Sequence, residues 1–286
     1  MRDAAGKDRG VPNVENKTSA APTHLTNFAH GMPKKTGLYD PAKEHDACGV
    51  GFIAHMKNVA SHKVIVDGLA MLENLTHRGA VGADPLAGDG AGMLVQIPHA
   101  FLAEECAKLG FTLPEPGDYG VGVFFMPQND DGFAFIVDLF EKIAAEEGLK
   151  VLGWRDVPVD NSCLSDGVRA TEPRHRQVFV ERPAELDESA FERRLYLVRK
   201  VVSNRRLELE GPSTEGYYPV SASTRTLVYK VMFLAYQLGA YYKDLKDERF
   251  VSALALVHQR FSTNTFPAWP LAHPYRMVAH NGEINT

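Results

Sequence analysis

The chain has 286 residues, of which 44% are hydrophobic and 23% are charged. This is the usage of an ordinary globular protein, and it excludes a disordered, collagen-like or membrane-spanning chain. Lys and Arg number 31 against 36 Asp and Glu, so the net charge of −5 offers no general attraction to nucleic acid or to a membrane, and we expect neither as a partner. The first thirty residues lack the apolar stretch of a secretory signal, which predicts a cytoplasmic protein.

The three cysteines, Cys48, Cys106 and Cys163, include no CxxC pair, so neither a disulfide framework nor a zinc ribbon is expected. Residues 1 to about 43 are polar, with apolar residues too sparse to form a buried face. They predict a disordered tail or leader. Order is expected to begin at Cys48–Ala54, whose short, apolar and glycine-containing sequence is typical of a buried strand.

The first half of the chain then alternates between helical and strand patterns. Ile65, Leu69, Leu72 and Leu75 have helical spacing, and that helix is expected to end near Gly79. The glycine-rich run 88–92 lacks the GK[ST] continuation of a phosphate-binding loop and is predicted to be a plain loop. The patterns further predict strands at 93–97 and 119–126 and helices at 99–109 and 133–144.

The second half continues the mixture. The spacing of Phe191, Leu195, Val198 and Val202 predicts a helix, which Ser189 would begin through a capping box. A helical stretch is expected at 232–242, and strands are expected at 151–157, 177–181, 226–230, 253–258 and 276–279. Strands and helices mix without a strict β-α-β order, so the predicted class is layered α/β or α+β.

Three short segments place a reactive or anion-recognising group beside a small residue: Cys48-Gly49, the run 258–265 (HQRFSTNT) and the run 280–283 (HNGE). Each alone has an ordinary interpretation. A single cysteine in an apolar strand is usually a small buried hydrophobe, and an Asn-Gly pair is usually a hairpin turn.

Together and in this order, the segments resemble the glutaminase domain of the class II glutamine amidotransferases, which are N-terminal-nucleophile (Ntn) hydrolases. Longer stretches resemble the large subunits of glutamate synthases: DACGVGFIA from Asp46, LTHRGAVGADPLAGDGAG from Leu75, and LVHQRFSTNTFPAWPLAHPYRMVAHNGEINT from Leu256. The resemblance covers the chain from about Asp46 to Thr286. It implies a four-layer αββα sandwich in which helices cover two antiparallel sheets.

The resemblance also implies the chemistry. Residues 1–47 would be a leader whose removal makes Cys48 the first residue of a glutamine amidotransferase type 2 domain, 48–286. The α-amine of Cys48 would then activate its own thiol toward L-glutamine. Asn281 and Gly282 match the family's oxyanion donors, Arg260 matches the arginine that binds the substrate carboxylate, and Thr263 is expected to add a hydroxyl contact.

The family's domains continue beyond the Asn-Gly pair with the acidic group for the substrate α-amine, so we expect a C-terminally incomplete domain. No cofactor or metal is expected in this segment. FMN and an iron–sulfur cluster are implied for the full protein, as are the remaining synthase domains and electrons from a small subunit or ferredoxin. Ammonia would pass to 2-oxoglutarate.

Two other functions remain open. Cys48 could instead belong to a cysteine hydrolase that uses His258 or His280 as the base and keeps its leader. The chain could also be a non-catalytic fragment that serves as a binding or assembly surface.

Overall fold

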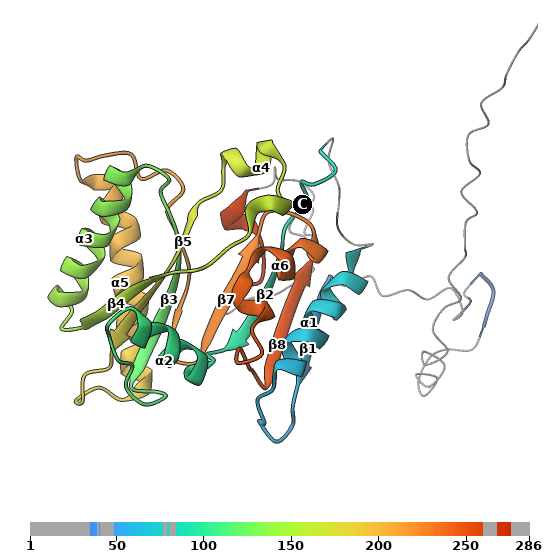
Figure 1. Ribbon diagram of the computed structural model, residues 1–286, viewed down its shortest axis with the longest axis horizontal. Helices are drawn as coiled ribbons and strands as arrows, with labels where there is room; N and C mark the ends of the chain where they lie inside the picture. Colours follow the sequence, from blue (N-terminus) through green and yellow to red (C-terminus); the bar gives the residue numbers. More distant parts are fainter. Residues whose placement is uncertain are drawn as a thin grey trace, which may run out of the picture. The chain divides into compact units, whose positions relative to one another are not determined.

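The computed structural model describes residues 35–38, 40, 49–76, 79, 84–259 and 268–275 (Figure 1). Its contacts divide the chain into two units, Met1–Asp46 and Ala47–Thr286. In the described part of the first unit, Lys35 Nζ lies 2.8 Å from the carboxylate of Asp40. The predicted leader lies almost entirely outside the described residues.

The second unit alternates strands and helices along the chain. The strands are β1 (Val50–Ala54), β2 (Ala91–Gln96), β3 (Tyr119–Met126), β4 (Lys150–Asp156), β5 (Arg174–Glu181), β6 (Tyr218–Ser223), β7 (Thr226–Val231) and β8 (Leu254–Gln259). The α-helices are α1 (His62–Asn74), α2 (His99–Lys108), α3 (Asp130–Glu146), α4 (Asp166–Ala170), α5 (Glu188–Glu208) and α6 (Ala235–Tyr241). Short 3₁₀ turns lie at Asn161–Cys163, Lys243–Lys246 and Trp269–Leu271.

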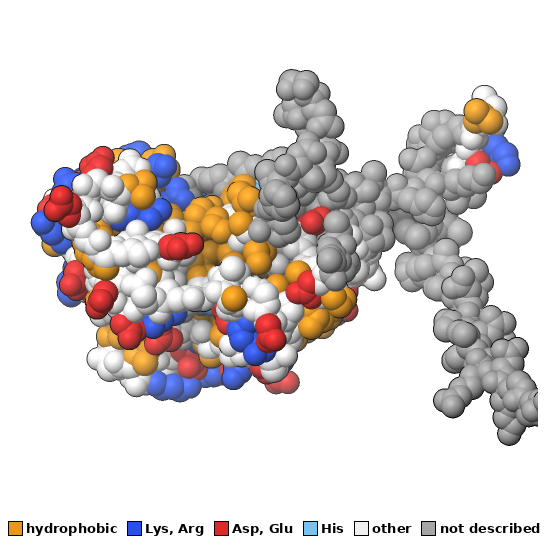
Figure 2. Space-filling view, turned by 90° about the horizontal axis from the view of Figure 1, so that it is seen from above, with side chains coloured by type: hydrophobic (Ala, Val, Ile, Leu, Met, Phe, Trp, Pro, Cys, Tyr) orange, Lys and Arg blue, Asp and Glu red, His pale blue; other side chains and the backbone are white. Residues whose placement is uncertain are grey.

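The strands form two antiparallel sheets, ordered β1-β8-β2-β7 and β4-β5-β3-β6 among the described residues. Helices α3 and α5 pack together over the second sheet, and α1 and α6 lie against the first (Figure 1). Two antiparallel sheets with helices packed around them confirm the predicted mixed class and agree with an Ntn-hydrolase sandwich. Figure 2 shows charged side chains around the end that carries α3 and α5, and hydrophobic side chains exposed in the middle of that face.

The helices largely follow the predicted stripes. Ile136, Phe140 and Ile143 of α3 are buried as its spacing predicts, and the helix begins three residues earlier than expected because Asn129 accepts a hydrogen bond from the Gly132 amide. The capping box at Ser189 is wrong. Asp187 caps α5 instead, accepting from the Ala190 amide at 2.7 Å, because a carboxylate two residues earlier already satisfies the first turn.

The first strand differs from its prediction. β1 begins at Val50, and its Phe52 is 67% exposed, so the expected buried strand is wrong. Among the described strands, β1 pairs only with β8. Glycine does permit a close approach to the strand backbone here: a Cβ at Gly51 would overlap the Met71 sulfur of α1, so this side chain packs directly on the strand.

Other boundaries shift for local reasons. β2 takes up the last two residues of the predicted 88–92 loop, and α1 ends at Asn74, before Gly79. No sequence pattern predicts β6, because Pro219 and two serines weaken its strand character. The predicted strand 276–279 lies outside the described residues.

A buried polar network built around an ion pair joins the two sheets. Arg155 of β4 donates two hydrogen bonds to the carboxylate of Asp244, both at 2.7 Å, and both side chains are almost fully buried. Arg155 also donates to Gln177 of β5, while Tyr229 of β7 donates to Asp244. Burial by itself lowers the pKa of Arg155, but the hydrogen bonds to Asp244 raise it above its ordinary value.

We expect Asp244→Ala to lower the free energy of unfolding by about 3–5 kcal/mol, because it leaves the Arg155 charge buried without its partner. Chemical denaturation measures this. Asp166→Ala is the control, since the Asp166 carboxylate is fully exposed and lies 3.9 Å from its arginine, and it should change stability by less than about 0.5 kcal/mol. Equal effects of the two substitutions would contradict the role of the pair.

Candidate active site

All five predicted site residues lie outside the described part of the chain: Cys48, Arg260, Thr263, Asn281 and Gly282. The structure does describe the residues next to two of them. Gly49 follows Cys48, and Gln259 precedes Arg260. The elements that adjoin these two residues in the sequence can therefore be described.

Gly49 and Gln259 are joined by backbone pairing. The backbone N–H of Gln259 donates to the backbone carbonyl of Gly49 at 2.8 Å. The antiparallel register continues with Val50 opposite His258. In an antiparallel pair, the start of one strand lies beside the end of the other. The chain therefore leaves β8 toward Arg260 at the same edge of the sheet where it enters β1 from Cys48.

Residues at these strand ends form a row across the sheet. Val50, His258, Gly92 and Lys230 stand opposite one another on β1, β8, β2 and β7, so they share one face. Gly92 leaves a gap in this row. A Cβ there would overlap the His273 carbonyl oxygen and lie 2.9 Å from Pro274, so residues 268–275 pass directly over the strand backbone.

This covering segment, residues 268–275, is held by packing and by hydrogen bonds. The Trp269 ring lies among aromatic rings of the second sheet and of α6, including Phe125 and Tyr241, and its indole N–H donates to the Thr171 hydroxyl. The His273 ring stacks on His258 at 4.5 Å between centroids. In the sequence, the covering segment joins the Arg260–Thr263 stretch to the Asn281-Gly282 pair.

The histidine alternative falls partly within the described residues. His258 is only 2% exposed and packs against His273 on the face that also carries Val50. His280 lies outside the described residues.

The other two cysteines are poorly suited to nucleophilic attack. Burial raises the pKa of the Cys106 thiol to about 12, and burial also raises the pKa of Cys163. A thiol needs its thiolate form to attack, so both stay largely protonated near neutral pH.

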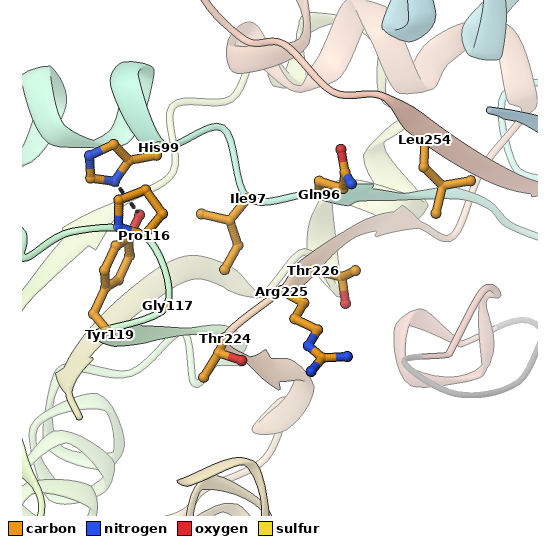
Figure 3. Close-up of a pocket in the computed structure, with 10 residues that line it drawn as sticks. All are labelled: Gln96, Ile97, His99, Pro116, Gly117, Tyr119, Thr224, Arg225, Thr226 and Leu254. Carbon is orange, nitrogen blue, oxygen red and sulfur yellow. Dashed lines mark hydrogen bonds between the residues drawn. The ribbon is translucent and has the colours of Figure 1, made fainter. Parts of the chain in front are cut away.

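A separate pocket of about 430 Å³ lies at the opposite edge of the sheet (Figure 3). Its lining includes Gln96 and Thr226, which stand opposite each other at the far ends of β2 and β7, and it includes a His99 ring nitrogen 3.1 Å from the Tyr119 hydroxyl. β2 runs from the strand ends beside Gln259 to this pocket, so the pocket lies at the other end of the strands. Within the described ranges there is also no cluster of three or more His, Cys, Asp or Glu side chains suited to a metal, and no helix has the length and apolar character needed to cross a bilayer.

Comparison with known proteins identifies the family. The sequence model described as "Glutamine amidotransferases class-II" matches residues 48–286. The chain belongs to the class II glutamine amidotransferases. It is a glutamine amidotransferase domain homologous to the large chains of glutamate synthases, which are enzymes.

Three relatives illustrate this homology. The chain is 48% identical over 258 residues to "Glutamate synthase [NADPH] large chain" of Bacillus subtilis, covering 89% of this chain. It is 43% identical over 283 residues to "Glutamate synthase [NADH]" of Schizosaccharomyces pombe, covering 96%. It is 40% identical over 278 residues to a ferredoxin-dependent glutamate synthase of Arabidopsis thaliana, covering 97%. The matches span 16%, 13% and 17% of the length of these relatives.

Sequence patterns in the amidotransferase domain do not single out three residues near the site: Gly92, Lys230 and His273. Lys230 offers a signal, because it is the only charged residue in the otherwise apolar stretch of β7 from Leu227 to Val231. The glycine-rich pattern places Gly92 in a loop, which hides its cross-strand contact. The packing of His273 on His258 depends on tertiary structure, and no local pattern indicates it.

We expect Gly92→Ala to destabilise the amidotransferase domain by about 1–3 kcal/mol, because the new methyl group must displace the covering segment from β2. Thermal or chemical denaturation measures the loss. Gly167→Ala is the matched control: the nearest atom to its added Cβ lies 3.9 Å away, and we expect little loss of stability. A Gly92→Ala protein as stable as the wild type would contradict the close approach.

Proposed function

We propose that this domain hydrolyses the side-chain amide of L-glutamine, with the sulfur of Cys48 as nucleophile. The observation that carries the proposal is the hydrogen bond between Gly49 and Gln259, which sets the residues next to Cys48 and Arg260 on paired strand ends. The family match, which begins at Cys48, also supports it. So does the raised thiol pKa of the other two cysteines.

In this mechanism, removal of residues 1–47 frees the α-amine of Cys48. A free cysteine thiol has a pKa of about 8.5 and an α-amine about 7.7–8.0, so the amine can take the thiol proton near neutral pH. While the leader is attached, the same nitrogen is an amide and has no basicity. Cleavage therefore switches on the nucleophile.

The thiolate attacks the amide carbon of glutamine and forms a tetrahedral oxyanion. Asn281 through its side-chain N–H and Gly282 through its backbone N–H donate to that oxygen, and one such donor typically contributes about 2.7–4 kcal/mol to lowering the barrier. The C–N bond then breaks, and the amine proton passes to the leaving nitrogen to give ammonia. Water hydrolyses the resulting thioester to glutamate and restores the thiol.

Arg260 binds the substrate α-carboxylate in this scheme. Its planar guanidinium donates two parallel hydrogen bonds, an arrangement that lysine cannot reproduce. Thr263 adds a hydroxyl contact.

The fate of the ammonia concerns a longer protein. We infer from the homology that ammonia passes to 2-oxoglutarate, whose imine is reduced to glutamate by synthase domains carrying FMN and an iron–sulfur cluster. The relatives named above are designated by NADPH, NADH and ferredoxin, although all three match this domain at 40–48% identity. Similarity within this domain therefore does not distinguish a small-subunit electron donor from ferredoxin.

We expect Cys48→Ala to abolish glutamine hydrolysis, measured as glutamate and ammonia released by the full chain. Cys163→Ala, which removes a cysteine of the 3₁₀ turn Asn161–Cys163, should retain activity. Mass spectrometry of the mature protein should show Cys48 as the first residue. Full activity with residues 1–47 attached would favour the cysteine hydrolase that uses His258 or His280. If no preparation hydrolyses glutamine, the binding or assembly role gains support.

A second substitution tests the carboxylate contact. We expect Arg260→Lys to raise KM for glutamine about tenfold or more with a smaller change in kcat, because one of two charge-assisted hydrogen bonds is lost. Steady-state kinetics measure it, and Arg225→Lys, at an exposed ion pair with Glu188, is the control. Equal kinetics for Arg260→Lys and wild type would refute the assigned role.

A further inference from the structure

Lys230 is a buried lysine within the apolar strand β7. Its residue is 0% exposed, and it stands on the sheet face that the covering segment crosses, directly opposite Gly92. Taking an ammonium group out of water is costly, and proteins usually bury a charge only beside an opposite one.

Among the described residues, none supplies that opposite charge to Lys230. Its Nζ donates to the Pro270 carbonyl oxygen at 2.7 Å, and it lies over the rings of Tyr218 and Tyr275, 4.5 and 4.7 Å from their centroids. No carboxylate in the described part of the chain forms an ion pair with it. Tyr275 and Pro270 both belong to the covering segment, so one side chain contacts this segment at two places.

Stability alone does not account for a charge here. Replacing a buried charge with an apolar side chain of similar volume is often neutral or stabilising. Consistent with a real desolvation cost, burial lowers the pKa of Lys230 to about 7. The hydrogen bond from Lys230 to the Pro270 carbonyl oxygen ties this side chain to the backbone of the covering segment.

The contact at Pro270 matters because of where the covering segment lies in the chain. Arg260 and Thr263 precede the covering segment, and Asn281 and Gly282 follow it. Trp269 anchors the segment in the aromatic core and His273 anchors it on His258. Lys230 adds a directional polar contact at Pro270, between these two packing contacts.

We propose that Lys230 is a positioning residue, which holds the covering segment so that the substrate-binding Arg260 and the oxyanion donors Asn281 and Gly282 keep their relative positions. This inference rests on the glutaminase function proposed above for its catalytic consequence. The contact between Lys230 and the covering segment, called the clamp below, does not depend on that function.

The test uses Lys230→Met, Lys230→Arg and the control Lys63→Met in the full chain. Methionine keeps the length and apolar stem but removes the donor and the charge, whereas arginine keeps both. Lys63 is 78% exposed on α1 and pairs only with Asp67 among the described residues, so its substitution should change nothing. Three quantities are measured: the melting temperature, hydrogen–deuterium exchange of peptides covering 268–275, and steady-state glutaminase kinetics.

We expect Lys230→Met to keep or raise the melting temperature while exchange accelerates in residues 268–275 and not in β3 or β5. The same variant should lose roughly 10- to 100-fold in glutaminase kcat/KM, with kcat falling and KM rising together, because small displacements of positioned groups carry penalties of this size. Lys230→Arg should recover part of both the protection and the activity.

Other results overturn the proposal. Unchanged exchange in 268–275 would remove the clamp, and accelerated exchange with unchanged kinetics would remove the positioning role. A Lys230→Met protein that fails to fold would make the role of the lysine structural. If the wild-type protein does not hydrolyse glutamine, the proposed function fails, and the exchange data still decide whether the clamp exists.

Discussion

The pairing of β1 with β8 is the constraint on which the rest of the site depends. It joins the beginning of the second unit to a strand near its end, and it does so through backbone hydrogen bonds that any side chains could accompany. What the sequence adds is the placement of chemistry-bearing residues just outside the paired ends. Because the contact is long-range, its loop-closure entropy is large, and folding of the intervening chain must offset it.

Two buried basic side chains have different kinds of partner in this fold. Arg155 is matched by Asp244 in a two-pronged pair, supported by Gln177 and Tyr229, so strands of both sheets share one polar network. In the part of the chain that the structure describes, Lys230 contacts a carbonyl oxygen and two aromatic rings, and no carboxylate pairs with it. The first arrangement secures the relation between the sheets. The contacts of Lys230 hold the covering segment, residues 268–275, against β7. This segment is not a strand, so backbone pairing between strands cannot hold it there.

The sequence predicts those parts of the fold that local periodicity determines. The apolar spacing locates α3 and α5 and shows which of their faces are buried, and the short apolar runs locate β3, β7 and β8. Periodicity does not reveal β6, whose proline and serines disguise a strand, nor the exposure of Phe52, which depends on how the strands are ordered.

The candidate site also has a part that the sequence predicts and a part that it does not. The motif residues from Cys48 to Gly282 are predicted from family resemblance, and they lie outside the described residues, so their roles stay predictions. The neighbouring contacts of Gly92 and His273 could not be inferred, because they join segments far apart in the sequence.

Gly51 and Gly92 allow close contacts on the two faces of the sheet at this end of the strands. At Gly51 the Met71 side chain of α1 lies against the strand backbone on one side of the sheet, and at Gly92 the His273 backbone of the covering segment lies against it on the other. A side chain between two layers can absorb a small shift by changing rotamer, whereas bare backbone cannot. The covering segment must therefore move together with β2 at Gly92, whereas at Gly51 the Met71 side chain can adjust its rotamer when α1 shifts against β1.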